Sequence, residues 1–156
     1  MIFILDADLF DVKADVLAHQ VNCMGVMGSG VAAQVKQIYP EAFHFYKKIC
    51  SAMTPYALLG MMLLAKTQDP NAKHQAVANL CGQFGYGRGF CHTDYESLRM
   101  ALGNLAERMT EEGFRTVALP YNLGCGRGGG NWDIVLNLIE TQLKDFDVYI
   151  CRKDMG

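Results

Sequence analysis

The sequence predicts an α/β fold: a three-layer α/β/α sandwich with a mixed central sheet. Short apolar runs typical of buried strands alternate along the chain with longer amphipathic segments typical of helices. Such alternation favours a largely parallel sheet that is covered by helices on both faces. The 156 residues are enough for one domain with its own core, so residues 1–156 are predicted to form a single domain.

Six apolar segments are predicted to form the strands. The first, IFIL, directly follows Met1 and ends before Asp6, and the others have the same short, apolar character. The third and fourth are separated by KTQDPNAKH, whose Asp-Pro-Asn step has the chemistry of a turn, so they are expected to pair as a hairpin. The predicted strands are residues 2–5, 16–21, 59–65, 75–80, 116–120 and 147–151.

Four amphipathic segments are predicted to form the helices. Thr93 is expected to cap the third helix with Glu96 as its capping-box partner, and Gly113 is expected to end it. The last helix begins with Trp132, which is expected in the core because apolar residues follow it at spacings of three and four. The predicted helices are residues 30–38, 40–54, 94–112 and 132–146.

Composition and charge exclude several classes of protein. The net charge of −2 gives no general attraction to nucleic acid or to an anionic membrane, so any phosphate must be held locally. The N-terminus has no leading basic residues and no run reaches the roughly 18 apolar residues of a membrane span, so neither a secretory signal nor a membrane partner is expected. The six cysteines contain no C-x-x-C pair, which argues against a metal site and favours free thiols in a reducing cytoplasm.

Three glycine-rich loops follow predicted strands: VNCMGVMGSGVAAQVKQ, GQFGYGRG and NLGCGRGGGNW. The first fits neither a Walker A loop nor the G-x-G-x-x-G pattern. In an open α/β sheet, loops at the carboxyl ends of strands line a common crevice, where bare backbone and helix N-termini offer N–H groups to an anion. The sequence therefore predicts a site for a diphosphate with attached riboses.

Taken together, these segments resemble the macrodomains, a family that binds ADP-ribose. The resemblance rests on Ala7-Asp8-Leu9 after the first strand, on N-x-x-G-V-M-G-x-G-V-A over residues 22–32, and on L-G-C-G-x-G-G before the last helix. It spans nearly the whole chain, residues 2–150. It implies the macrodomain fold, with ADP-ribose or an ADP-ribose derivative as ligand, an ADP-ribosylated protein or nucleic acid as a further partner, and no cofactor.

The resemblance also implies roles for individual residues. Asp8 would accept a hydrogen bond from the adenine amino group beside the Leu9 N–H, and Asn22 would contact the distal ribose. Phe84 and Tyr86 lie inside a loop, which favours them for stacking on the adenine or covering the distal ribose. The predicted ligand-binding residues are Asp8, Leu9, Asn22, Gly28, Ser29, Gly30, Val31, Gln83, Phe84, Tyr86, Asn122, Gly124, Cys125, Gly126, Arg127 and Gly128.

Catalysis at the distal ribose is assigned to His19, Asn22 and Asp133 as candidates. Family members that remove ADP-ribose from glutamate or thymine carry a lysine where this sequence has Gln83, and an acidic residue after the G-C-G loop, for which Asp133 is the nearest carboxylate here. Phosphatase-type members resemble the segment around His19, whose imidazole would act as base or nucleophile toward a terminal phosphate. A structural role for a buried His19 and a helix-dipole role for Asp133 stay open.

Three functions therefore remain open. The main prediction is an enzyme, either an ADP-ribose 1″-phosphate phosphatase or an ADP-ribosyl hydrolase. The second is a module that binds ADP-ribose without turnover, which Gln83 and the missing loop acid favour, and the third is an unrelated nucleotide-binding domain.

The remaining histidines, His44, His74 and His92, are expected at the surface or at caps, without metal-ligand spacing.

Overall fold

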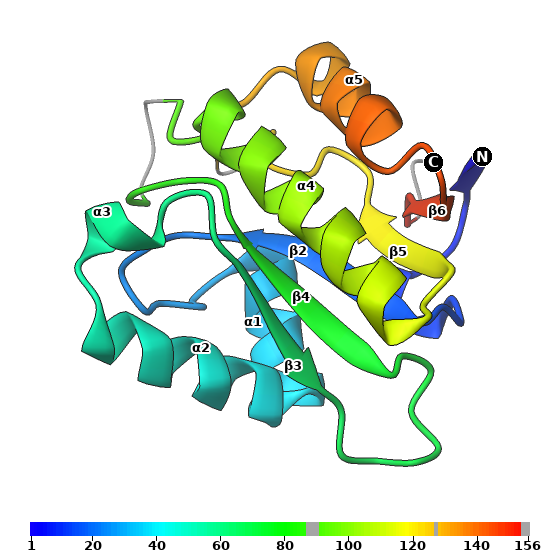
Figure 1. The fold of residues 1–156 in the computed structure, drawn as a ribbon, viewed down its shortest axis with the longest axis horizontal. Helices are drawn as coiled ribbons and strands as arrows, with labels where there is room; N and C mark the ends of the chain where they lie inside the picture. Colours follow the sequence, from blue (N-terminus) through cyan, green and yellow to red (C-terminus); the bar gives the residue numbers. More distant parts are fainter. Residues whose placement is uncertain (87–90, 127, 154–156) are drawn as a thin grey trace.

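The computed structural model describes residues 1–86, 91–126 and 128–153 (Figure 1). Its strands are β1 (Ile2–Leu5), β2 (Val16–Val21), β3 (Met62–Lys66), β4 (Ala76–Cys81), β5 (Thr116–Pro120) and β6 (Asp147–Cys151). They form one sheet in the order β1-β6-β5-β2-β4-β3. Neighbouring strands are parallel except β3 and β4, which are antiparallel and form the predicted hairpin. The predicted mixed sheet is confirmed.

Helices cover both faces of this sheet, as Figure 1 shows. They are α1 (Gly30–Ile38), α2 (Pro40–Ala52), α3 (Pro55–Leu58), α4 (Tyr95–Glu112) and α5 (Trp132–Gln142), with a short 3-10 helix, η1 (Leu9–Asp11). Neighbouring residues on β2 point to opposite faces, so Val16 joins the core under α4 and α5 whereas Leu17 joins the core under α1 and α2. The three-layer sandwich is confirmed. Within the described residues, no helix combines the length and apolarity needed to cross a membrane.

The segment between α2 and β3 differs from the prediction of a helix to residue 54 and a strand from residue 59. α2 ends two residues early because Pro55 disfavours helical backbone at the residue before it. Thr54 is instead extended, and its hydroxyl accepts a backbone N–H of α3 at 3.3 Å. Gly60 has a φ of 88°, in the left-handed region, so the chain turns there and β3 begins two residues later.

The N-terminus of α4 is capped by Asp94, so the predicted Thr93 cap is wrong. Asp94 Oδ1 accepts the Ser97 N–H at 3.1 Å. The buried Thr93 hydroxyl donates instead to the Gly124 carbonyl oxygen at 2.6 Å, because the last glycine loop lies directly against it. The other end agrees with the prediction: Gly113, with a φ of 74°, ends the helix.

His74 is buried, contrary to the expected surface position. The Tyr39 hydroxyl oxygen lies 2.6 Å from His74 Nδ1, and His74 Nε2 lies 2.8 Å from the Val12 carbonyl oxygen. A carbonyl oxygen only accepts, so Nε2 carries the proton and Tyr39 donates to Nδ1. His74 therefore joins two segments that are distant in the sequence, which no local pattern reveals.

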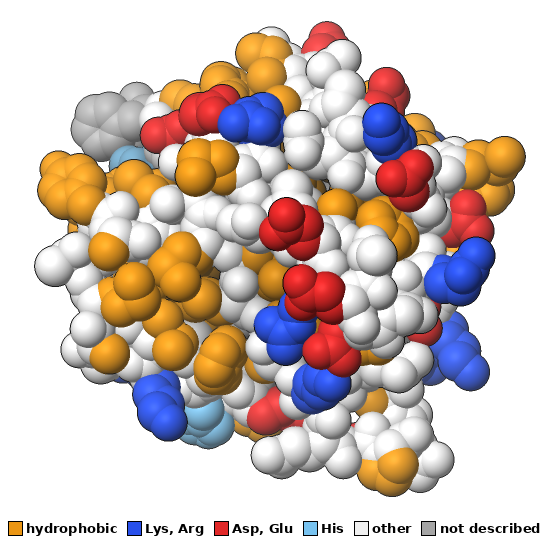
Figure 2. Space-filling view, viewed as in Figure 1, with side chains coloured by type: hydrophobic (Ala, Val, Ile, Leu, Met, Phe, Trp, Pro, Cys, Tyr) orange, Lys and Arg blue, Asp and Glu red, His pale blue; other side chains and the backbone are white. Residues whose placement is uncertain are grey.

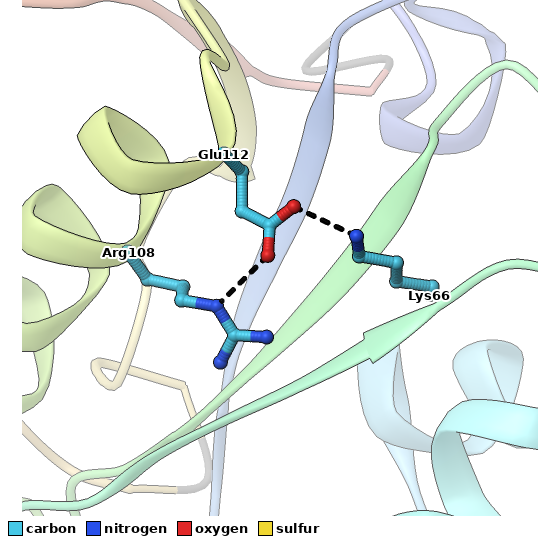
Figure 3. A network of polar contacts seen from close by, with 3 residues as sticks. All are labelled: Lys66, Arg108 and Glu112. Carbon is cyan, nitrogen blue, oxygen red and sulfur yellow. Dashed lines mark hydrogen bonds and ion pairs between the residues drawn. The ribbon is translucent and has the colours of Figure 1, made fainter.

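The edge strand β3 is joined to α4 by charged side chains (Figure 3). Glu112 accepts hydrogen bonds from Lys66 Nζ at 2.7 Å and from Arg108 Nε at 3.2 Å. Both partners lower the pKa of the Glu112 carboxyl group, Lys66 first. Because the network is open to solvent, it adds little to stability.

Candidate functional site

The three glycine-rich loops line one cavity of about 570 Å³ at the carboxyl ends of β2, β4 and β5. This volume is typical of a small-molecule site. The described lining residues include no Asp, Glu, Lys or Arg. The lining includes these residues that the sequence predicted to bind ligand or to take part in catalysis: His19, Asn22, Gly28, Ser29, Gly30, Val31, Gln83, Tyr86, Asn122, Gly124, Gly126 and Gly128.

The start of α1 forms one wall of the cavity. Ser29, its N-cap residue, is extended and makes no side-chain capping bond. The N–H groups of a helix's first turn have no partner within the helix, so α1 presents them here with the positive end of its dipole. Gly30 has a φ of 60° and open space where a Cβ would stand, so a ligand can approach its backbone. This wall is suited to an anion such as a phosphate.

Asn22, only 8% exposed, organises the loop that leads to α1. Its Oδ1 accepts the Met24 N–H and the Tyr46 hydroxyl, each at 2.9 Å, and its Nδ2 donates to the Val26 carbonyl oxygen at 2.8 Å. The buried Tyr46 hydroxyl also accepts the Gly25 N–H at 3.1 Å. These contacts fix the carboxamide and leave its second N–H for a ligand in the cavity.

The loop after β5 is held against the sheet by Gln20 and Thr93. Gln20 Nε2 donates to Thr93 Oγ1 at 2.9 Å and to Gln83 Oε1 at 2.8 Å. A Cβ at Gly128 would lie 2.6 Å from the Gly124 carbonyl oxygen and 2.6 Å from Thr93 Oγ1. Glycine is therefore required at position 128 for the loop to pack this closely.

His19 also lines the cavity and is 1% exposed. Its Nε2 lies 2.7 Å from Asn79 Oδ1, and Asn79 Nδ2 donates to the Leu63 carbonyl oxygen at 3.1 Å. The Leu63 carbonyl orients the Asn79 amide, so Nε2 of His19 must carry the proton. Nδ1 then holds a buried lone pair with no hydrogen-bond partner among the described residues. Burial lowers the pKa of His19 to about 4, so the ring is neutral at pH 7 and its Nδ1 can accept a hydrogen bond.

Stability is expected to fall in acid because His19 is held neutral. Its pKa drops from the ordinary 6.5 to about 4 on folding, so between these values the unfolded chain binds more protons. The contribution of the neutral His19 to the free energy of unfolding is fully present above pH 6.5 and is lost as the pH falls toward 4. Between pH 7.5 and pH 5 the free energy of unfolding should fall by about 2 kcal/mol. Urea unfolding at these two pH values measures it.

Two variants separate this contribution from other acid effects. His19→Gln should lose less stability than the wild type on acidification, although part of the loss remains because burial also lowers the pKa of His74. His44→Gln, at an exposed position of α2, should lose as much as the wild type. A His19→Gln variant with the full wild-type loss would contradict the assignment.

A second cavity of about 220 Å³ adjoins the first and shares Val31 and Asn122 with it. Asp8 and Leu9 line it, as does Lys153. Asp8 accepts the Phe10 N–H at 2.9 Å and lies 3.0 Å from Lys153 Nζ, and these contacts lower the pKa of its carboxyl group. The two predicted halves of the site, around residue 8 and around the glycine loops, are therefore neighbours.

Three predicted residues lie outside the lining of both cavities. Asp133 is exposed on α5 and is not among the residues that line either cavity. Phe84 stacks on Tyr56 outside the lining, with ring centroids 4.6 Å apart. Cys125 is half-buried outside the lining, and Arg127 falls outside the described residues. The carboxylate at position 133 is therefore exposed on the first turn of α5.

Two residues that organise the site, Tyr46 and Thr93, were not predicted to act there. Neither carried a signal in the sequence, because each acts through a partner that is distant along the chain. All six cysteines are free thiols, as expected. Within residues 1–86, 91–126 and 128–153, no three His, Cys, Asp or Glu side chains are placed to hold a metal ion.

Comparison with known proteins agrees with this architecture. The chain is 30% identical over 156 residues to the DNA ADP-ribosyl glycohydrolase of Mycobacterium tuberculosis, an alignment that covers 92% of the chain and 40% of the relative. It is 36% identical over 88 residues to the ADP-ribose 1″-phosphate phosphatase of Meyerozyma guilliermondii, which covers 51% of the chain and 50% of that protein. The chain therefore spans less than half the length of the glycohydrolase.

Comparison with solved structures and with a family model gives the same agreement. The macrodomain of Mycobacterium tuberculosis DarG superimposes with a TM-score of 0.82 at 30% identity, covering 99% of both chains. A macrodomain protein from Streptomyces coelicolor superimposes with a TM-score of 0.75 at 27% identity, covering all of both chains. The Macro domain family matches residues 18–139. The chain belongs to the Macro domain family.

Proposed function

We propose that this chain binds ADP-ribose, or a molecule that contains it, in the two adjoining cavities. The observation that carries the proposal is the uncapped start of α1 facing the glycine loop after β5 across one cavity. N–H groups and a helix dipole can hold a diphosphate there without any charged side chain. The compartment beside Asp8 would then take the adenine.

We further propose that the chain hydrolyses the bond at the distal ribose. Water would add to C1″ while the bond from C1″ to the acceptor group breaks, and the acceptor would leave with a proton. His19 lines this cavity, and its Nδ1, which has no hydrogen-bond partner among the described residues, would take the proton of the water, while the second N–H of the Asn22 amide would orient the ribose. The alignment with a DNA ADP-ribosyl glycohydrolase over 92% of the chain favours a nucleic acid base as the acceptor.

A second candidate function is binding without turnover. Gln83 favours it, because both ends of its amide are engaged, Oε1 with Gln20 and Nε2 with the Gly85 carbonyl oxygen at 2.6 Å. An amide does not ionise in the accessible pH range, so Gln83 cannot supply a base. Under this function His19 would only complete the polar floor of the site.

Calorimetry with ADP-ribose tests the binding proposal, and two release assays test hydrolysis. The substrates are an ADP-ribosylated single-stranded oligonucleotide and ADP-ribose 1″-phosphate. We expect saturable ADP-ribose binding and release from the oligonucleotide that His19→Gln slows by about 100-fold. Binding with no release from either substrate would establish the binding module, and no binding of ADP-ribose would refute the proposed site.

A further inference from the structure

A partly exposed pair of aromatic rings lies beside the main cavity. Tyr56, on α3, is 78% exposed, and its ring packs against the half-buried Phe84 with a centroid distance of 4.6 Å and an interplanar angle of 37°. The Thr54 cap and Pro55 hold the short helix that carries Tyr56. A tyrosine ring that is fixed in place and largely open to water offers a flat apolar face to a planar partner.

The loop that carries Phe84 is also a wall of the cavity. Gln83 and the 59%-exposed Tyr86 line it, on either side of Phe84 in the sequence. The Phe84 carbonyl oxygen accepts the Cys23 N–H at 3.0 Å, which joins this loop to the one that Asn22 organises. A chain attached to the distal ribose would therefore leave the cavity close to the Tyr56 and Phe84 rings.

The charge of the surrounding segments suits an anionic chain. Although the protein has a net charge of −2, residues 16–86 carry two acidic residues, Glu41 and Asp69, against Lys36, Lys47, Lys48, Lys66 and Lys73, of which Lys66 pairs with Glu112. Figure 2 shows acidic and basic side chains interspersed over α4, whereas the surface over α2 and α3 is largely apolar, with a basic side chain at its border. Lys47, on α2, reaches to 3.5 Å from the Gly25 carbonyl oxygen in the Asn22 loop. Lys47 thus brings positive charge to the Asn22 loop, which is hydrogen-bonded to the loop that carries Phe84.

We infer that the Tyr56 and Phe84 rings bind an unpaired nucleobase that flanks the ADP-ribosylated base, while Lys47 attracts the phosphate backbone. Aromatic side chains beside a basic surface are the usual means of holding single-stranded nucleic acid without sequence preference. The inference rests on the proposed function and narrows it, because it makes a nucleic acid strand the carrier of the ADP-ribose group.

A second exposed aromatic pair provides a matched control. Phe3, on β1, is 38% exposed and packs against Tyr149 with a centroid distance of 5.7 Å. It lies at the opposite edge of the sheet from β3 and lines neither cavity. Phe3→Ala and Tyr56→Ala therefore remove the same kind of side chain, one of them away from the site.

The test uses a fluorescein-labelled, unmodified oligothymidylate of about 12 nucleotides, a length that spans a typical single-strand site. Fluorescence anisotropy measures its binding, and calorimetry measures ADP-ribose binding by the same proteins. Tyr56→Ala should weaken oligonucleotide binding by about tenfold and leave the Kd for ADP-ribose unchanged. Lys47→Gln should weaken oligonucleotide binding mainly at low salt and reduce its salt dependence. Phe3→Ala should match the wild type in both assays.

Several outcomes would overturn the inference. The inference is wrong if Tyr56→Ala binds the oligonucleotide as tightly as the wild type does. It is also wrong if Phe3→Ala loses as much affinity for the oligonucleotide as Tyr56→Ala, or if the wild-type protein does not bind the oligonucleotide. If Tyr56→Ala slows the release of ADP-ribose from an ADP-ribosylated peptide but does not weaken binding of the oligonucleotide, the surface binds a protein acceptor instead. Failure of the proposed function has a different signature: the oligonucleotide binds through Tyr56, but ADP-ribose does not bind.

Discussion

Replacing Asn22 with alanine is expected to slow release of ADP-ribose by about 100-fold, because small displacements at a reacting centre have large effects on rate. Binding of ADP-ribose should weaken by only about tenfold, the effect of one lost hydrogen bond. The diphosphate would still be held by the N–H groups at the start of α1, although the loop that leads there loses the three contacts of the Asn22 carboxamide. Single-turnover release from an ADP-ribosylated oligonucleotide and calorimetry with ADP-ribose measure the two effects separately.

Two variants show whether the effect belongs to the Asn22 carboxamide. Tyr46→Phe removes the hydroxyl whose proton lies between the backbone carbonyl oxygen of Asn22 at 2.8 Å and Asn22 Oδ1 at 2.9 Å but keeps the carboxamide, so it should slow release by an intermediate factor. Asn137→Ala, at an exposed position of α5, should leave both rate and affinity unchanged. If Asn22→Ala weakens binding and release equally, Asn22 has no separate role in the reaction.

Gly128→Ala is expected to destabilise the protein by about 2–3 kcal/mol and to abolish tight ADP-ribose binding. The added methyl group would lie 2.6 Å from the Gly124 carbonyl oxygen, which is backbone and cannot rotate away. It would also lie 2.6 Å from Thr93 Oγ1, whose bond to Gly124 holds the loop in place. Urea unfolding monitored by circular dichroism gives the change in the free energy of unfolding.

Gly126→Ala is the matched change in the same loop, and its expected outcome is different. Apart from its neighbours in the chain, no described residue has an atom within 4 Å of a Cβ at this position, so the free energy of unfolding should stay within about 0.5 kcal/mol of the wild-type value. Gly126 lines the cavity, so the methyl group should still weaken ADP-ribose binding. Equal unfolding free energies for Gly126→Ala and Gly128→Ala would mean that the loop does not pack as described.

Features that depend on neighbours in the sequence were predicted well. The strands at residues 2–5, 16–21, 116–120 and 147–151 have the predicted bounds, since apolar runs bounded by polar or turn residues report burial directly. The hairpin between β3 and β4 follows from its turn chemistry. The glycine loops line a common cavity because parallel strands bring their carboxyl ends to one edge of the sheet.

Features that depend on distant partners were missed or wrongly assigned. Thr93 has the composition of a helix cap, but Gly124, 31 residues further along the chain, takes its hydroxyl. The sequence around His74 predicts a surface residue. In the structure His74 is buried and hydrogen-bonded to Tyr39 and Val12, which are 35 and 62 residues away. Phe84 was expected in the pocket, yet Tyr56 holds it outside the lining.

The sequence by itself determined the order of strands and helices, the mixed sheet and the position of the glycine loops, because periodicity, turn residues and backbone freedom act over short stretches of chain. Tertiary structure alone decided the chemistry of the site. The proton of His19 is placed by Asn79, 60 residues away, and Gln20 reaches Gln83 and Thr93 across 63 and 73 residues. Hydrogen bonds at such separations form only once the sheet has assembled, so no local pattern encodes them.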